Sequence, residues 1–268
     1  MRKTVTVVET RLGKIRGTEG EGVEIFRGIP YAKAPLGRLR LRPPLPPEPW
    51  AGIREATQSG PCAPQNASMV GALLGLPATE VSEDCLTLNV WTPAAGDGRR
   101  RPVLVWIHGG AFVFGSGSQA PYEGAQLSAL GDVVVVTLNY RLGALGFLAL
   151  PALAEEEGGV CGNFGLLDQI AALEWVRDHA AVFGGDPDRV TIFGESAGAM
   201  SVGTLLGTPA ARGLFRNAIA QSGAAHNVST PEQGERVAHA FMKELGLALT
   251  DVEGLRAIPV SAILAAQQ

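Results

Sequence analysis

The sequence predicts an α/β protein with a mostly parallel central sheet, and three observations lead to that prediction. Val103–Ile107 and Val133–Leu138 are uninterrupted apolar runs, as expected of strands that are buried on both faces of a sheet. Downstream of them, segments with helical spacing alternate with further short apolar segments. This alternation is typical of a parallel sheet covered by helices. No internal repeat or charge block divides the chain, so we treat residues 1–268 as one domain.

The N-terminal region predicts a small β-sheet of its own. Its short strand-like segments, punctuated by glycines, are Val5–Glu9, Lys14–Arg16 and Val23–Arg27. The segment Pro43–Pro49 must be extended, because each proline fixes its own φ and restricts the residue before it. It fits either a connector that leads to Trp50 or a ligand for an SH3-type domain.

The remaining elements follow in chain order. The expected strands are Leu86–Trp91, Val190–Phe193 and Ala218–Gln221, and the expected helices lie around Leu166–Val176, from Ala197 to about Leu206, and from Pro231 onward. The last helix should begin with a capping box, because Thr230–Gln233 places Thr and Gln three residues apart with a proline at the first helical position. We expect its apolar stripe to consist of Val237, Phe241 and Leu245.

Composition and charge exclude several classes of protein. With 22 basic and 26 acidic residues the net charge is −4, and no long basic run is present, so we expect no nucleic-acid partner. The apolar stretch Leu142–Ala154 is broken by glycines and a proline, and we expect no membrane span. Residues 1–10 contain no sustained apolar segment, which favours a cytoplasmic protein. Three cysteines without a Cys-x-x-Cys or Cys/His cluster favour no metal site.

The strongest chemical signal is the pentapeptide Gly194–Gly198, which reads Gly-Glu-Ser-Ala-Gly. It follows a predicted strand and precedes a predicted helix, the context of a nucleophile elbow, in which Ser196 sits in a strained turn with its hydroxyl exposed. The flanking glycines fit because a Cβ there would crowd the neighbouring strand or helix. The amide of Ala197, at the helix start, favours negative charge. The alternative is that Ser196 is an ordinary helix N-cap.

A second signal lies upstream, where the strand Val103–Ile107 leads into His108–Phe112, which reads His-Gly-Gly-Ala-Phe. Small residues let backbone amides approach a substrate oxygen closely, and two consecutive N–H groups can converge on it. By itself the segment could be an ordinary tight turn. Followed by a serine elbow after a later strand, it indicates an oxyanion hole.

At this point the chain resembles the type-B carboxylesterases, which include bacterial carboxylesterases, cholinesterases and neuroligins. The segments that carry the resemblance are FRGIPYAKAPLGRLRLRPP, SEDCLTLNVWTP, WIHGGAF, VVTLNYRLGALGFL, GNFGLLDQIAALEWVRDHAAVFGGDPDRVTIFGESAGAMS and LFRNAIAQSG. They match the N-terminal half of that family. The resemblance implies an α/β-hydrolase fold whose C-terminal half is missing from these residues.

The resemblance also implies roles for individual residues. Ser196 corresponds to the acyl-forming nucleophile, and Gly110, Ala111 and Ala197 correspond to the oxyanion hole. Two residues have less certain counterparts: Glu195 resembles a buried carboxylate beside the nucleophile, or else fills the turn, and Ser222 resembles a serine near the catalytic histidine, or else caps a strand. The resemblance further implies structural ion pairs, expected to be exposed and weak, and a cysteine pair whose bonding we leave open. These are Arg40–Glu83, Arg141–Asp168 and Cys62–Cys85.

A catalytic acid and histidine are not evident. In α/β-hydrolases they follow the serine in the order acid, then histidine. His226 has no carboxylate between itself and Ser196, and His239 should face solvent near Glu235. The two earlier histidines, His108 and His179, fit structural roles. We therefore expect a truncated esterase, inactive alone, whose sheet has an unpaired edge where later strands would add.

The function that fits best is hydrolysis of a small-molecule carboxylic ester through an acyl-enzyme on Ser196, without a metal or organic cofactor. One alternative is a non-catalytic binding module like the neuroligins, although the intact elbow weighs against it. Another is hydrolysis of an amide, carbamate or lactone, which the elbow does not distinguish from ester cleavage. Acyl and alcohol specificity and the oligomeric state are open at this level.

Overall fold

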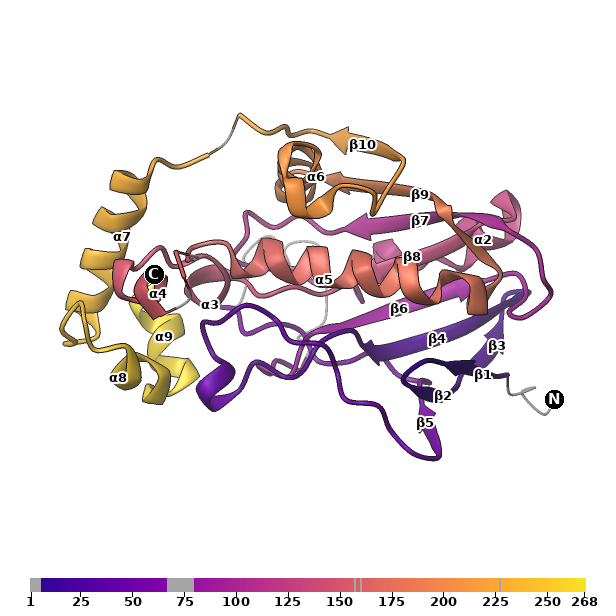
Figure 1. The fold of residues 1–268 in the computed structure, drawn as a ribbon, viewed down its shortest axis with the longest axis horizontal. Coiled ribbons are helices and arrows are strands. Elements are labelled where there is room, and N and C mark those ends of the chain that lie inside the picture. The colour runs from indigo at the N-terminus through magenta and orange to yellow at the C-terminus, as the bar shows by residue number, and fades with distance from the viewer. Residues whose placement is uncertain (1–5, 67–79, 157, 160, 227) are drawn as a thin grey trace.

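A computed structural model describes residues 6–66, 80–156, 158–159, 161–226 and 228–268. Its centre is a seven-stranded sheet in the order β10-β9-β7-β8-β6-β4-β3 (Figure 1). The strands are β3 (Thr18–Gly20), β4 (Val23–Pro30), β6 (Thr87–Thr92), β7 (Arg101–Ile107), β8 (Val134–Leu138), β9 (Gly185–Glu195) and β10 (Asn217–Gln221). The α/β-hydrolase fold class is confirmed. The sheet is mixed, because β8, β7, β9 and β10 are parallel whereas β6, β4 and β3 pair antiparallel.

The small N-terminal sheet is also present, but the expected strand Val23–Arg27 does not belong to it and lies in β4 of the central sheet. Its strands are β1 (Val7–Thr10), β2 (Gly13–Arg16) and β5 (Ile53–Glu55); β1 is antiparallel and β5 parallel to β2. Val5, where the first strand was expected to begin, lies outside the described residues. The proline-rich segment has no regular secondary structure, and the Trp50 indole that follows it donates to the carbonyl of Lys14, 2.9 Å away. It is a connector within the fold.

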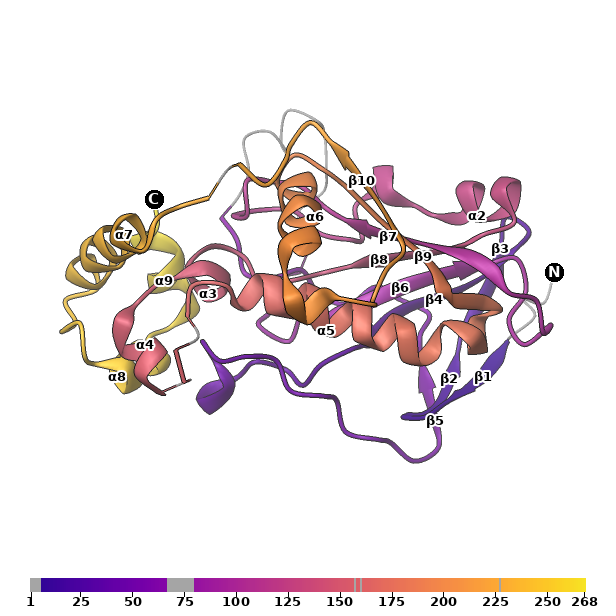
Figure 2. The same cartoon turned by 45° about the horizontal axis from the view of Figure 1, so that its top comes forward.

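The central strands are apolar throughout because both faces are covered. On one face, Val103, Val105, Val134 and Val136 belong to the core that α5 (Phe164–His179) completes. On the other face, Val135 packs with Trp91 and with Ala125 of α2 (Ala125–Gly131). Figure 2 shows α5 lying along its face of the sheet and α6 (Ala197–Gly207) beside β9 and β10.

A second apolar core lies at one end of the molecule, on the left of Figure 1. The helices there are α3 (Gly143–Phe147), α4 (Pro151–Glu156), α7 (Pro231–Glu244), α8 (Val252–Ala257) and α9 (Val260–Ala266). The capping box of α7 is confirmed. Its apolar stripe was predicted wrongly in one position, since Val237 is 65% exposed and Ala238, Phe241 and Met242 are buried. The buried face is thus turned by one residue, and Ala238, Phe241 and Met242 lie in the apolar core that α3, α4, α8 and α9 also line.

The two ion pairs exist, but the expectation that they are exposed is wrong. Arg141 binds both carboxylate oxygens of Asp168 at 2.7 and 2.8 Å, and the Asp168 side chain is 0% exposed. Arg40 binds Glu83 in the same two-point manner and also donates to the carbonyls of Arg256 and Ile258. Both pairs are buried because the helical end of the molecule closes over the N-terminal segment that carries Arg40. Removing one partner from a pair in this setting costs far more than breaking a surface pair, because it leaves a buried charge without its counter-charge.

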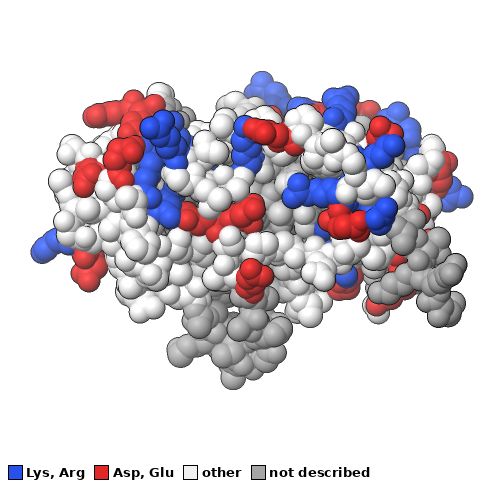
Figure 3. Space-filling view, turned by 90° about the horizontal axis from the view of Figure 1, so that it is seen from below, with Lys and Arg blue, Asp and Glu red and all other residues white. Residues whose placement is uncertain are grey.

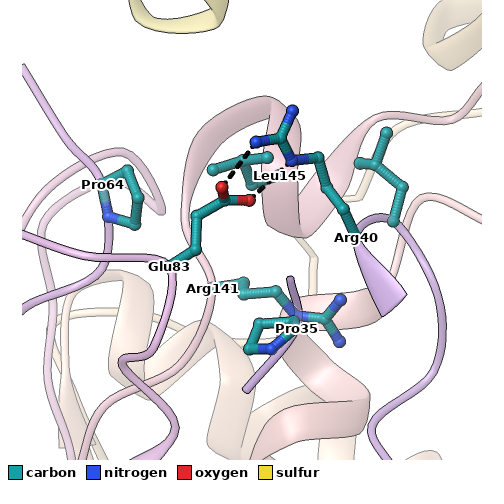
Figure 4. A pocket seen from close by; sticks show the side chains of 7 residues that line it. Pro35, Arg40, Pro64, Glu83, Arg141 and Leu145 are labelled. Carbon is teal, nitrogen blue, oxygen red and sulfur yellow. Dashed lines mark hydrogen bonds and ion pairs between the residues drawn. The ribbon is translucent and has the colours of Figure 1, made fainter. Parts of the chain in front are cut away.

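These charges border a small cavity of about 10 Å³, the size of one water molecule. In Figure 4 the Glu83 carboxylate faces the Arg40 guanidinium, and Pro35, Pro64, Leu145 and Arg141 lie around them. The cavity is too small for an organic substrate.

Cys85, one of the two cysteines whose bonding was left open, is a buried free thiol. Its burial raises the pKa of this thiol.

The described surface is mixed in charge where Figure 3 shows it, with basic and acidic side chains interspersed. Among the described helices, none is long and apolar enough to cross a bilayer. Strand β10 forms one edge of the sheet, and four of its five residues are exposed. No described strand pairs with its outer side, as the sequence predicts.

Candidate active site

Ser196 lies in a sharp turn between the end of β9 and the start of α6. Its φ is 55° and its ψ is −122°, a conformation that a non-glycine residue adopts only under strain. Its N–H donates to the carbonyl of Gln221 on β10 at 2.9 Å, and its carbonyl accepts from Met200 of α6 at 2.9 Å. The Ser196 side chain makes no capping hydrogen bond to α6. Ser196 thus occupies the N-cap position of α6, but its side chain does not cap the helix as an ordinary N-cap serine would.

The glycines on either side of Ser196 are required by close backbone approach. A Cβ on Gly194 would lie 2.6 Å from the backbone carbon of Gly198 and 2.7 Å from the carbonyl oxygen of Ile107. A Cβ on Gly198 would overlap the same Ile107 oxygen. The elbow is thus packed against the end of β7, which is the strand that leads into the His108–Phe112 loop.

That loop contacts the elbow directly through Gly109. A Cβ there would lie 2.7 Å from the carbonyl oxygen of Glu195 and 3.2 Å from the Cβ of Ser196. Beyond Gly109 the chain turns tightly, with φ values of 110° at Gly110 and 51° at Ala111, and the carbonyl of Gly110 accepts two hydrogen bonds from the turn. The segment is therefore a tight turn, and it is one that lies against the candidate nucleophile.

The backbone amides of Gly110, Ala111 and Ala197 lie near this contact, and they are among those without an acceptor in the part of the chain that the structure describes. Ala197 is the first residue of α6, where an N–H lacks an intrahelical partner and the helix dipole favours negative charge. Gly110 and Ala111 follow the residue that touches Ser196. Amides in this situation can bind an oxygen that carries negative charge.

His108 is a buried structural residue at the base of the loop. Its ring stacks on Tyr140 with 4.4 Å between centroids, and its Nδ1 lies 2.8 Å from the carbonyl oxygen of Gly109. The Tyr140 hydroxyl donates to the carbonyl of His108. Burial lowers the pKa of His108 to about 4, so the ring is neutral near pH 7. A neutral imidazole here donates from Nδ1 to Gly109, since the reverse tautomer would set a lone pair against the carbonyl oxygen.

The structure places both of the less certain site residues close to Ser196 but leaves them exposed. Glu195 precedes Ser196 on β9. The pKa of Tyr122 is raised, mainly because Tyr122 is partly buried and secondly because of the negative charge of Glu195. The expected buried carboxylate is not observed in the described residues, because Glu195 is exposed although Gly109 lies beside it. Ser222 follows β10 with a φ of 58° and is also exposed. It adjoins Gln221, which binds the Ser196 amide.

None of the four histidines hydrogen-bonds the Ser196 hydroxyl. His179 is buried against Trp175, and burial lowers its pKa. His226 is exposed, and His239 is exposed with its Nε2 3.7 Å from Glu235, as the sequence predicts. Among the described residues there is also no group of three or more His, Cys, Asp or Glu that could hold a metal ion.

Sequence reasoning missed two carboxamides that fasten the loop. Gln65 makes two hydrogen bonds with the backbone of Gly115, and Asn139 accepts from the amide of Gly117 and donates to the carbonyl of Pro61. Neither residue belongs to a motif with a local spacing. Side-chain pairing with a distant backbone leaves no periodic pattern that a single sequence could reveal.

Comparison with known proteins agrees with this geometry. The model of the carboxylesterase family matches residues 4–268. The chain belongs to the carboxylesterase family. A para-nitrobenzyl esterase of Bacillus subtilis is 47% identical over 266 residues, which are 98% of this chain and 53% of that protein. The acetylcholinesterase of Gallus gallus is 50% identical over 228 residues, 81% of this chain and 29% of that protein.

Solved structures of carboxylesterases show the same fold. A crystal structure of a Geobacillus stearothermophilus carboxylesterase matches with a TM-score of 0.90 and 50% identity, over 98% of this chain and 53% of that chain. This carboxylesterase-family chain therefore spans about half the length of the bacterial relatives that it matches. The matched half contains the elbow and the His108–Phe112 loop.

Proposed function

We propose that Ser196 is the nucleophile of a carboxylic-ester hydrolase. The observation that carries the proposal is the strained turn that presents Ser196 beside three amides without acceptors, those of Gly110, Ala111 and Ala197. A small carboxylic ester is the substrate class that the family suggests.

In the proposed reaction the Ser196 Oγ attacks the ester carbonyl carbon, and its proton passes to a general base. The carbonyl oxygen becomes negatively charged and is bound by the amides of Gly110, Ala111 and Ala197. The alkoxide leaves with the proton, and an acyl-enzyme remains on Ser196. Water then gives a proton to the base and attacks the same carbonyl carbon, the bond from that carbon to Oγ breaks, the acid is released and Oγ regains the proton. Because the amides are held by the backbone, they need no reorganisation when the charge develops, and removing one such donor costs on the order of a hundredfold in rate.

We further propose that the base and its carboxylate come from outside residues 1–268. Serine is a poor nucleophile without an imidazole that takes its proton. The described residues put no imidazole on the Ser196 hydroxyl, and the matched bacterial relatives are about twice as long. Residues 1–268 alone should then bind esters without appreciable turnover.

The test uses the protein at its full natural length and its Ser196→Ala variant. We expect hydrolysis of p-nitrophenyl acetate by the wild type, no turnover above background by the variant, and fluorophosphonate labelling at Ser196. The turnover of p-nitrophenyl acetate by residues 1–268 alone should not exceed that of the Ser196→Ala variant. Unlabelled Ser196 in an active protein would overturn the nucleophile assignment, and a fully inactive wild type would favour a binding module. Parallel assays with p-nitroacetanilide distinguish an amidase from an esterase.

A further inference from the structure

The turn that carries Gly110 and Ala111 is closed at its far end by Gly115, and a single side chain holds that glycine. The Nε2 of Gln65 donates to the carbonyl of Gly115 at 2.9 Å, and the Oε1 of Gln65 accepts from the amide of Gly115 at 2.8 Å. The same Nε2 also donates to the carbonyl of Ala63 at 3.0 Å. One carboxamide thus satisfies both backbone groups of a buried residue 50 positions away.

Gly115 in turn lies directly against the start of the loop. It has a φ of 114°, and a Cβ on it would lie 2.6 Å from both the carbonyl oxygen of Gly109 and the Nδ1 of His108. The Gly109 carbonyl and the Gly110 N–H belong to the same planar peptide group. The position of Gly115 therefore restricts the peptide plane whose N–H is the first of the three amides without acceptors.

The His108 ring also acts on the Gly109 carbonyl, because its Nδ1 lies 2.8 Å from that oxygen. The remaining fastenings of the loop act elsewhere. Tyr140 holds the carbonyl of His108, before the turn, and Asn139 holds Gly117, after Gly115. The amide of Gly143 donates to the carbonyl of Phe112 at 2.7 Å, on the outer part of the turn. In the described structure Gln65 is the side chain that binds the backbone of Gly115.

We propose that Gln65 is a positioning residue that sets the direction of the Gly110 amide by fixing Gly115 against the Gly109 carbonyl. The inference rests on the proposed function, because it assigns that amide to the developing oxyanion. Gln65 does not touch the substrate. The Gln65 carboxamide carries a donor and an acceptor on one carbon, whereas an apolar side chain has neither and an ionised carboxylate has no donor.

The neighbouring residue offers a matched control. Asn66 also carries a carboxamide and also donates to a backbone carbonyl, that of Leu264 in α9, at 2.8 Å. Among the described residues it makes no hydrogen bond with the loop. Asn66→Ala therefore removes a similar side chain from the same segment, while it leaves the partners of Gly115 in place.

The experiment measures kcat and KM for p-nitrophenyl acetate in the full-length protein, with variants Gln65→Ala, Gln65→Glu and Asn66→Ala. For Gln65→Ala we expect kcat to fall about tenfold to a hundredfold, near the effect of losing one oxyanion donor, with little change in KM. Asn66→Ala should keep the wild-type kcat. A Gln65→Ala enzyme with wild-type kcat, or a loss that Asn66→Ala reproduces, would overturn the proposal.

Gln65→Glu adds a readout that a purely structural role would not move. The ionised carboxylate can only accept, and it would face the carbonyls of Ala63 and Gly115, whereas the protonated carboxyl can donate to one of them. The ratio of its kcat to that of the wild type should therefore rise as the pH is lowered from about 8 to about 5. A kcat ratio of Gln65→Glu to wild type that does not change with pH overturns the proposal. This test can be used even if Gln65→Ala does not fold. An inactive wild type refutes the proposed function and with it this role, whereas an active wild type with unaffected variants refutes the role alone.

Discussion

Gly109→Ala tests whether the elbow and the His108–Phe112 loop work as one packed unit. Gly109 is the point of contact between them, and no unusual φ value at this position prevents alanine. The substitution therefore adds one methyl group and changes little else in the backbone preferences. Its effect reports on the packing between the two halves of the candidate site.

The size of the effect follows from the contact distances. The new Cβ would lie 2.7 Å from the carbonyl oxygen of Glu195, whereas ordinary contact begins at 3.4 Å, so the two segments must separate by about 0.7 Å (3.4 − 2.7). Overpacking of this kind costs about 1–3 kcal/mol of stability. A displacement of about 1 Å in a catalytic group costs on the order of a hundredfold in rate. We therefore expect kcat to fall by one to two orders of magnitude in a protein that still folds.

The assay is hydrolysis of p-nitrophenyl acetate by the full-length protein, with urea unfolding as the stability measurement. Gly207→Ala is the matched control, because a Cβ on this last residue of α6 meets nothing within 4 Å. It should retain wild-type activity and stability. If Gly109→Ala folds and keeps the wild-type kcat, the alignment of the loop with Ser196 does not depend on this contact, and the reasoning is refuted.

Three further predictions concern stability. Asp168→Asn leaves the buried Arg141 guanidinium without its counter-charge, so urea unfolding should show a loss of about 3–5 kcal/mol; a loss below about 1 kcal/mol would mean that the pair behaves as a surface pair. Burial lowers the pKa of His108 from 6.5 to about 4, so between these pH values only the unfolded chain binds the proton. The free energy of unfolding should therefore be unaffected by His108 above pH 6.5 and should fall by about 3 kcal/mol as the pH is lowered to 4. His108→Asn should remove this part of the pH dependence of unfolding, and an unchanged slope would contradict it. Phe241→Ala should cost about 3–5 kcal/mol and Val237→Ala less than about 0.5 kcal/mol, and equal costs in thermal or urea unfolding would contradict the burial of one and the exposure of the other.

The elements that could be predicted from the sequence are those with a local signature. The valine runs of β7 and β8 predict buried strands because a strand covered on both faces needs apolar residues at every position. The Gly-x-Ser-x-Gly elbow is predictable because a strained turn packed against Ile107 excludes a Cβ at both glycines. The same logic applies to Gly109 and Gly110 in the second loop.

Side-chain burial was harder to predict because it depends on elements that are distant in the sequence. Nothing near Arg40 indicates that the C-terminal end of α8 will lie against it, and the carbonyls that Arg40 binds there are more than 200 positions away. In α7 the spacing of Val237, Phe241 and Leu245 predicts a stripe, yet the neighbours that α7 meets turn the helix by one residue toward Ala238 and Met242. The spacing of apolar residues predicts that a helix has a buried face. It predicts which residues form that face only to within one position when small side chains border it.

The proposed role of Gln65 follows the same principle at the active site. A nucleophile and its oxyanion donors are recognisable in sequence because each occupies a conformation that few residues tolerate. The groups that aim those donors face no such restriction, since any side chain with a suitable donor and acceptor can reach a backbone group once the fold brings it near. Gln65 meets Gly115 only because the segment after Pro61 crosses the end of the sheet beside β7 and β8, where Asn139 also binds Pro61. Its contribution is therefore a property of the assembled fold, and a substitution that leaves every motif residue intact should still lower kcat.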